Sequence, residues 1–229
     1  MTKHCLALAL LVATVAGCGG SPKHAPATTE PTTTAAAKTM PLTVFRVEND
    51  TLRAESVQVP QTQAVAGAAL TALGIDARVT IDAGTARVEL QDATAAQVAE
   101  IVYTLTQFGS VQRVDVAGRS ALTRDDVVAF APVILLERPA AGSVVPEAFT
   151  VSGTASVFEA TLVIELRRNG AVLSKQTVTA SEGAPARGTF SLIVHAPSPG
   201  AVTVVAYSPS AADGTPQHKQ EVAVTAVKP

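Results

Sequence analysis

Apolar and polar residues alternate over two neighbouring short segments in the first half of the chain. Every second residue is apolar over residues 77–82, and the same alternation returns over residues 86–91. A period of two is typical of strands that bury one face and expose the other. The pair Ala83-Gly84 between the two segments predicts a turn, so this region is expected to form a β-hairpin.

Two longer segments repeat their apolar residues with the period of an α-helix. The first covers residues 61–73, is rich in alanine and ends at Gly74, a residue that commonly terminates helices. The second opens at Thr94, where Thr94 and Gln97 have the spacing of a capping box, and it closes at Gly109. The apolar face of this second helix consists of Val98, Ile101, Val102, Leu105 and Phe108.

Strands are also expected at residues 42–47 and 111–116, and Thr123 opens one more short helix that ends near Pro132. The order strand, helix, strand, strand, helix, strand over residues 41–131 predicts an α+β domain in which two helices cover one sheet face. About 91 residues are sufficient for one small hydrophobic core.

Helix signals disappear after Pro132, and short strand patterns follow one another to the end of the chain. The expected strands are residues 133–136, 149–154, 161–168, 171–179, 188–195, 201–208 and 217–227. Asn169-Gly170 lies between two of them and is a strong hairpin signal, because both turn positions need a positive φ. This pattern predicts an all-β immunoglobulin-like sandwich over residues 132–229.

The chain begins with Lys3 and then an apolar run over residues 5–16, which is too short to span a bilayer as a helix. The run ends in Val15-Ala16-Gly17-Cys18, which resembles the lipobox of bacterial lipoproteins. The resemblance implies a signal peptide over residues 1–17, cleavage before Cys18, and a diacylglyceryl group on the Cys18 thiol. An ordinary secretory signal cut elsewhere and a buried helix are the alternatives.

Residues 18–40 contain Pro22, Pro26, Pro31 and several threonines, and they lack a large apolar side chain before Met40. Such a segment has nothing to bury, so we expect a disordered tether between the lipid anchor and the folded body. Localisation is therefore expected to be extracytoplasmic, with the chain anchored to the bacterial cell membrane.

Composition excludes several classes of function. The formal net charge is −2 and aromatic residues make up 3% of the chain, with no tryptophan. A nucleic-acid partner is not expected, because phosphate contacts need a basic surface and base stacking needs aromatic side chains. Cys5 and Cys18 are the two cysteines. With Cys5 removed and Cys18 lipidated, the body can hold neither a zinc–thiolate site nor a catalytic cysteine.

The remaining candidate residues do not form a catalytic motif. His195 and His218 have no carboxylates at metal-ligand spacing, and Asp125 and Asp126 are explained by the start of a helix. We therefore expect no enzymatic activity, no metal and no cofactor.

Three residues of the second half remain as candidates for contact with a partner protein. Phe158 is expected to plug one end of the sandwich. Glu159 is expected to support a neighbouring loop or to face the partner, and Arg187 is a candidate to pair with Glu159.

The second half resembles the immunoglobulin-like Gmad-type domain of bacterial sporulation and germination proteins. The resemblance is carried by Arg138-Pro139, residues 142–145, residues 149–155, residues 157–161, residues 187–190 and Asp213-Gly214. The first half resembles the GerMN (sporulation and spore germination) domain, through residues 69–73, 84–90, 104–108 and 114–116. The two resemblances imply a ring-building-like α+β fold, protein–protein assembly and no catalysis.

The leading hypothesis is therefore a non-enzymatic, lipid-anchored envelope protein that acts through contacts with unidentified envelope proteins. Self-association through open edges of the α+β sheet is included, and the short junction over residues 130–133 predicts limited motion between the two domains. One alternative is an accessory binder or remodelling factor of the cell wall, which needs converging acids such as Asp115, Asp125 and Asp126. The other alternative is a structural spacer.

Overall fold

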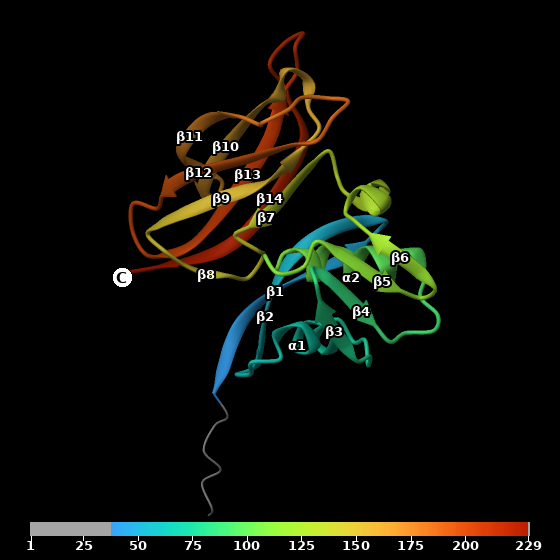
Figure 1. Cartoon of the computed structure of the whole chain (residues 1–229). Helices are drawn as coiled ribbons and strands as arrows, with labels where there is room; N and C mark the ends of the chain where they lie inside the picture. The colour runs from blue at the N-terminus through green and yellow to red at the C-terminus, as the bar shows by residue number, and fades with distance from the viewer. Residues whose placement is uncertain (1–37, 229) are drawn as a thin grey trace, which may run out of the picture. The chain divides into compact units, whose positions relative to one another are not determined.

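A computed structural model describes residues 38–228 (Figure 1). Lipidation at Cys18, the signal peptide and nearly all of the tether are predictions that lie outside the described residues. Within residues 38–228, no helix is long and apolar enough to cross a membrane.

The described chain opens with a long β-hairpin of β1 (Thr39–Glu48) and β2 (Thr51–Pro60), which pair in an unbroken antiparallel register. Asn49 and Asp50 form the turn with φ values of 49° and 58°, the positive values that a tight hairpin turn requires. Strand β2 was not predicted from the sequence. Its alternation is weak, because the buried positions Leu52 and Ala54 are even-numbered and the next buried position, Val59, is odd-numbered.

Two helices and a four-stranded sheet complete the first half. The elements are α1 (Val65–Ala72), β3 (Val79–Asp82), β4 (Thr85–Val88), α2 (Ala95–Thr106), β5 (Arg113–Val116), β6 (Arg119–Leu122) and a short 3-10 helix at Asp125–Phe130. The strands lie in the order β3-β4-β5-β6, and α2 connects the parallel pair β4 and β5. The predicted α+β class is confirmed. The strands form two sheets, however, because β1 and β2 pair with each other and not with the sheet.

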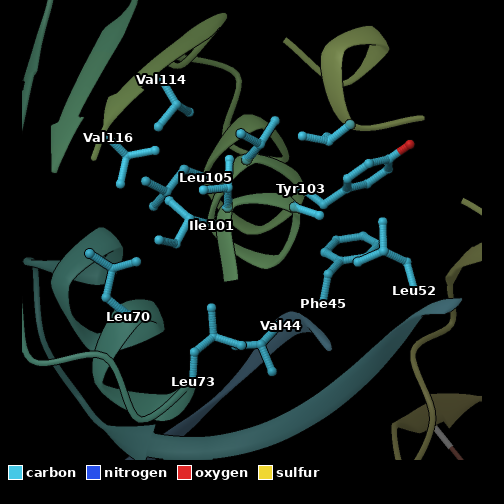
Figure 2. Close-up of a cluster of buried hydrophobic side chains, with 14 of the residues drawn as sticks. Val44, Phe45, Leu52, Leu70, Leu73, Ile101, Tyr103, Leu105, Val114 and Val116 are labelled. Atoms are coloured by element: carbon cyan, nitrogen blue, oxygen red, sulfur yellow. The ribbon is translucent and has the colours of Figure 1, made fainter. Parts of the chain in front are cut away.

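Helix α2 lies between these two sheets, and its buried side chains form the centre of the first hydrophobic core. Figure 2 shows Ile101, Tyr103 and Leu105 of α2 between Val114 and Val116 of β5 on one side and the hairpin on the other. The predicted capping box starts this helix: the Thr94 hydroxyl accepts the Gln97 N–H at 3.1 Å, and the Thr94 N–H donates to Gln97 Oε1 at 3.0 Å. Because α2 packs on both sides, its buried surface is wider than that of a helix on a single sheet.

The second half is a two-sheet β-sandwich, as predicted. Its strands are β7 (Ile134–Arg138), β8 (Val144–Pro146), β9 (Ala148–Ala155), β10 (Thr161–Arg168), β11 (Ala171–Thr179), β12 (Gly188–His195), β13 (Gly200–Pro209) and β14 (Pro216–Val227). One sheet has the order β11-β10-β13-β14-β8 and the other β12-β9-β7. Each predicted strand is present, and Asn169 and Gly170 have φ values of 50° and 83°. The three-residue strand β8 was not predicted.

Residues 37–229 form one compact unit. Leu135 and Ala140 of the second half are buried in the same core as Phe45 and Tyr103 of the first half. The Ser56 N–H donates to the Ala141 carbonyl at 2.8 Å, and the Ala141 N–H donates to the Ala54 carbonyl at 2.9 Å. Both halves therefore contribute to one folded body.

Candidate interaction surfaces

The loop between β9 and β10 presents an exposed aromatic side chain. Phe158 is 70% exposed, so the prediction that it plugs the end of the sandwich was wrong. That end is filled instead by the neighbours of Phe158 in the chain, since Val157 and Ala160 are buried in the sandwich core. A large apolar side chain held in water is a common feature of interaction sites.

The backbone under Phe158 adopts a conformation that costs free energy. Glu159 and Ala160 have φ values of 53° and 54°, in the left-handed region that residues other than glycine seldom enter. The segment 180–184 holds the loop in this shape: the Ala180 N–H donates to the Ala160 carbonyl at 2.8 Å, and the Ala184 N–H donates to the Val157 carbonyl at 2.9 Å. Strain of this kind is retained where surrounding contacts enforce it, often at functional sites.

The side chain of Glu159 is exposed and forms no ion pair with Arg187 in the described chain. The Arg187 guanidinium instead donates from Nη2 to the Pro132 carbonyl at 2.7 Å and from Nη1 to the Thr154 hydroxyl at 3.2 Å. Burial lowers the pKa of Arg187, and its Nε atom is buried without a hydrogen-bond partner. The expected Arg187–Glu159 pair was therefore wrong, and Arg187 supports the start of the sandwich.

A second arginine, Arg124, connects the α+β half to the sandwich. Its Nη1 lies 2.9 Å from each carboxylate oxygen of Glu137 on β7. Its guanidinium lies 4.8 Å above the ring of Tyr103 and 5.7 Å from that of Phe45. Burial raises the pKa of Tyr103, so the Tyr103 hydroxyl stays neutral beside Arg124. The arrangement stabilises the junction between the halves and leaves little of Arg124 free for a ligand.

The acids required for a cell-wall ligand do not converge. The Asp115 carboxylate accepts the Ala121 N–H at 2.8 Å and lies 3.5 Å from Arg87 Nε, beside a surface hollow of about 490 Å³ that neither Asp125 nor Asp126 lines. Asp126 accepts the N–H and the hydroxyl of Thr123, both at 2.8 Å, and these bonds lower its pKa. Its carboxylate closes the turn before the short helix, which matches the structural role expected from the sequence.

The two candidate histidines, His195 and His218, are exposed. Among residues 38–228, no three His, Cys, Asp or Glu side chains gather in a way that could hold a metal ion.

One buried charge had no signal in the sequence. Glu165 is 4% exposed and lies on the outer face of the five-stranded sheet. It accepts the Tyr207 hydroxyl at 2.9 Å and the Arg167 Nε–H at 2.8 Å, with Lys175 Nζ at 3.6 Å. Burial disfavours the charge, but the bonds from Arg167 and Tyr207 hold the pKa of Glu165 below its ordinary value. The carboxylate is fully engaged, so this cluster stabilises the sheet.

The edges of the first hairpin are covered. On the outer side of β1, the N–H groups of Phe45 and Val47 bond to the side chains of Thr104 and Glu100 of α2. The Thr43 carbonyl accepts from the side chain of Gln107, the C-cap of the same helix. On the outer side of β2, Ala141 occupies the edge through the two bonds described above. Strand addition at this hairpin would first have to break those bonds.

Comparison with known proteins identifies the second half. Residues 133–215 match the Gmad2 family, described as the immunoglobulin-like domain of bacterial spore germination, which confirms the resemblance inferred for this half. No curated protein matches the chain.

The solved structures that are similar to the chain include two of low sequence identity. One is an engineered protein at 21% identity and a TM-score of 0.31, with 52% of this chain and 23% of that chain covered. The other contains the tandem GerMN domains of the sporulation protein GerM from Bacillus subtilis, at 13% identity and a TM-score of 0.29, with 82% of this chain and 61% of that chain covered. The chain thus spans less than two thirds of the length of either structure.

Proposed function

We propose that this protein is a non-enzymatic, lipid-anchored component of the bacterial cell envelope that acts by binding other proteins. The observation that carries the proposal is Phe158, which is 70% exposed on a loop with two consecutive left-handed residues. Exposed aromatic side chains on preformed loops serve as anchors in protein interfaces, because they bury much apolar area at little entropic cost. The family of residues 133–215 is described by its fold and by spore germination, and not by a chemical reaction.

The chemistry around Phe158 indicates what a partner would offer. Glu159 follows it directly, and Glu182 lies on the segment that packs under the loop. The packing is close, because a Cβ atom added to Gly183 would lie only 2.9 Å from the Ala160 nitrogen. Glu159 and Glu182 are both exposed. A partner is therefore expected to provide an apolar pocket with positive charge at its rim. We further propose that residues 41–131 act as a GerMN-like assembly domain and that residues 18–40 separate the body from the membrane.

The contact is tested with Phe158→Ala in the full chain, expressed in a bacterium that carries the natural gene. Covalent cross-linking followed by purification should recover partner proteins with the wild type, and the variant should lose most of them. Val144→Ala is the matched control, because Val144 is 68% exposed on the edge strand β8 of the same sandwich. Equal recovery with Phe158→Ala, in a protein of unchanged thermal stability, would remove Phe158 from the proposed interface.

The anchor is tested separately with Cys18→Ala. This variant should lose labelling by a fatty-acid analogue and move from the membrane fraction to the soluble fraction. A variant that remains labelled and membrane-bound would contradict the lipoprotein interpretation, whatever the result at Phe158.

A further inference from the structure

Strand β12 has an outer edge to which no other described residue hydrogen-bonds over most of its length. The Ala196 N–H donates to the Glu147 carbonyl at 2.7 Å, which fixes the phase of the β12–β9 ladder. The even-numbered residues of β12 therefore bond to β9, and the odd-numbered residues direct their N–H and C=O groups to the opposite side. At Thr189 these groups bond to Ser181. At Ser191, Ile193 and His195, no described residue bonds to them.

The other sheet edges carry features that oppose pairing with a second chain. The edge strands β3 and β6 have four residues each and β8 has three, with Asp82, Arg119 and Pro146 among them. Strand β7 contains Glu137 and an irregular register, and β11 has Lys175 in its middle. Short length, charge, proline and irregularity are the usual protections of edge strands.

Strand β12 has none of these protections. Its eight residues include no Asp, Glu, Lys, Arg or Pro, and its register with β9 is regular throughout. Ile193 lies at the centre of the open stretch and is 60% exposed. A regular, uncharged edge with an exposed isoleucine is typical of a strand that pairs with another chain.

We propose that β12 pairs with β12 of a second copy of this chain, antiparallel about a two-fold axis at Ile193. In this register, Ile193 lies opposite Ile193 of the second copy, and Ser191 lies opposite His195 of the second copy. The pairing would form about six backbone hydrogen bonds and join two three-stranded sheets into one. The inference deepens the proposed function, on which it rests, by naming one partner of the assembly.

Self-complementarity selects a second copy over an unrelated peptide. The two-fold axis places each exposed Ile193 against its equivalent, so both apolar side chains are removed from water. It also places no like-charged Lys, Arg, Asp or Glu side chains of β12 against each other, since the strand has none.

The test uses the fragment 37–229, which is one compact unit and contains no cysteine. Sedimentation velocity over a concentration series should show a monomer–dimer equilibrium. Ile193→Lys should raise the dimer dissociation constant at least tenfold, because it places two like charges opposite each other. Val172→Lys is the matched control: Val172 is 51% exposed on the edge strand of the other sheet, and its substitution should leave the constant within about twofold.

The register is tested with a spin label on Thr150→Cys. Thr150 is exposed and lies beside Ile193 in the β9–β12 register, so the two Thr150 backbones would be three strand spacings, about 14 Å, apart. Pulsed dipolar spectroscopy should give a label separation below about 25 Å.

Three outcomes would overturn the proposal. The first is a monomer at every concentration. The second is an unchanged dimer dissociation constant in a correctly folded Ile193→Lys variant. The third is a label separation far above about 25 Å. Ser191→Pro removes an outward N–H and gives a second way to block the edge should Ile193→Lys fold poorly. These measurements need neither the anchor nor Phe158, so a failure of the β12 pairing is distinguished from a failure of the proposed function and leaves that function standing.

Discussion

Strands β1 and β12 both lie at the edge of a sheet, but the outward backbone groups of β1 are hydrogen-bonded and most of those of β12 are not. On β1, every second residue from Thr43 to Val47 bonds outward to a side chain of α2 or of its C-cap residue, over distances of 2.8 to 2.9 Å. On β12, the outward groups of Ser191, Ile193 and His195 bond to no described residue. An edge strand is thus protected, or left open, by what a different element places beside it.

The periodicities of strand and helix explain how α2 covers β1. The helix side chains that bond to β1 are Glu100, Thr104 and Gln107, which are spaced by four and three residues and so share one face. The strand groups they meet are spaced by two residues and so share one edge. The two repeats have nearly equal lengths along their axes, about 5 to 7 Å, which lets one helix face follow one strand edge.

The largest contrast is expected from proline on β12. Leu192→Pro removes an N–H that bonds to β9 and should lower the free energy of unfolding by about 3 kcal/mol or more. Ser191→Pro removes an N–H that points outward, and the loss should be about 1 kcal/mol or less. Urea denaturation of the two variants measures both values. Equal losses would show that the outward assignment of the odd residues is wrong.

The next largest effect is expected where β1 is covered. Thr104→Val replaces a buried hydroxyl by a methyl group of the same shape and leaves the Phe45 N–H buried without an acceptor. We expect a loss of about 2 kcal/mol in the free energy of unfolding. Thr104→Ser keeps the acceptor and should retain most of the stability. If the valine variant is as stable as the serine variant, the hydroxyl contributes little to the protection of β1.

A smaller loss is expected at the end of the same helix. Gln107 Nε2 donates to the Thr43 carbonyl at 2.8 Å and to the Thr104 carbonyl at 2.7 Å, in a part-buried position. Gln107→Ala should therefore lower the free energy of unfolding by about 1 kcal/mol. Hydrogen exchange of the β1 amides should quicken in this variant more than exchange of the β9 amides. Uniform quickening would indicate a global effect in place of an opened edge.

Sequence patterns predicted the elements of this fold better than the contacts between them. The apolar residues Leu162, Ile164 and Leu166 and the Asn169-Gly170 turn predicted β10 and β11 with their observed bounds, because one face of β10 lies in the sandwich core and the turn fixes the hairpin. The separate hairpin sheet was missed, since the partner of β1 is set by the packing of α2 and not by a local pattern. The prediction that Phe158 lies in the core was wrong, because a single aromatic residue in a loop has no periodic pattern that would predict whether its side chain faces the core or the solvent.

Within the candidate site, the sequence predicted which residues are of interest but not which residues contact one another. Phe158 and Glu159 were singled out in the sequence, and the structure places them together on an exposed loop. Arg187 was selected with them but bonds to Pro132 and Thr154, more than thirty positions away in the chain. Glu165 had no signal at all, because its burial depends on Tyr207 and Arg167 meeting on the outer face of the sheet.

The smallest effect is expected on β11, whose Lys175 distinguishes it from β12. Lys175 Nζ lies 3.6 Å from Glu165, and the lysine is more than half exposed, so Lys175→Met should lower the free energy of unfolding at neutral pH by less than any of the changes above. The pKa of Glu165 is held below its ordinary value of 4.5 in the folded chain. The stability that ionised Glu165 contributes is therefore fully present above pH 4.5 and is lost as the pH falls through the lower folded value.

The cost of Lys175→Met should disappear over the same acid range, because a neutral Glu165 no longer attracts the lysine. Unfolding curves of both proteins along a pH series measure this difference, and a cost that persists in acid would place the contribution of Lys175 outside the ion pair. The variant also removes the charge from the β11 edge. If charge is what keeps β11 from pairing, Lys175→Met should sediment as species larger than the dimer, and adding Ile193→Lys should limit assembly to pairs formed through β11.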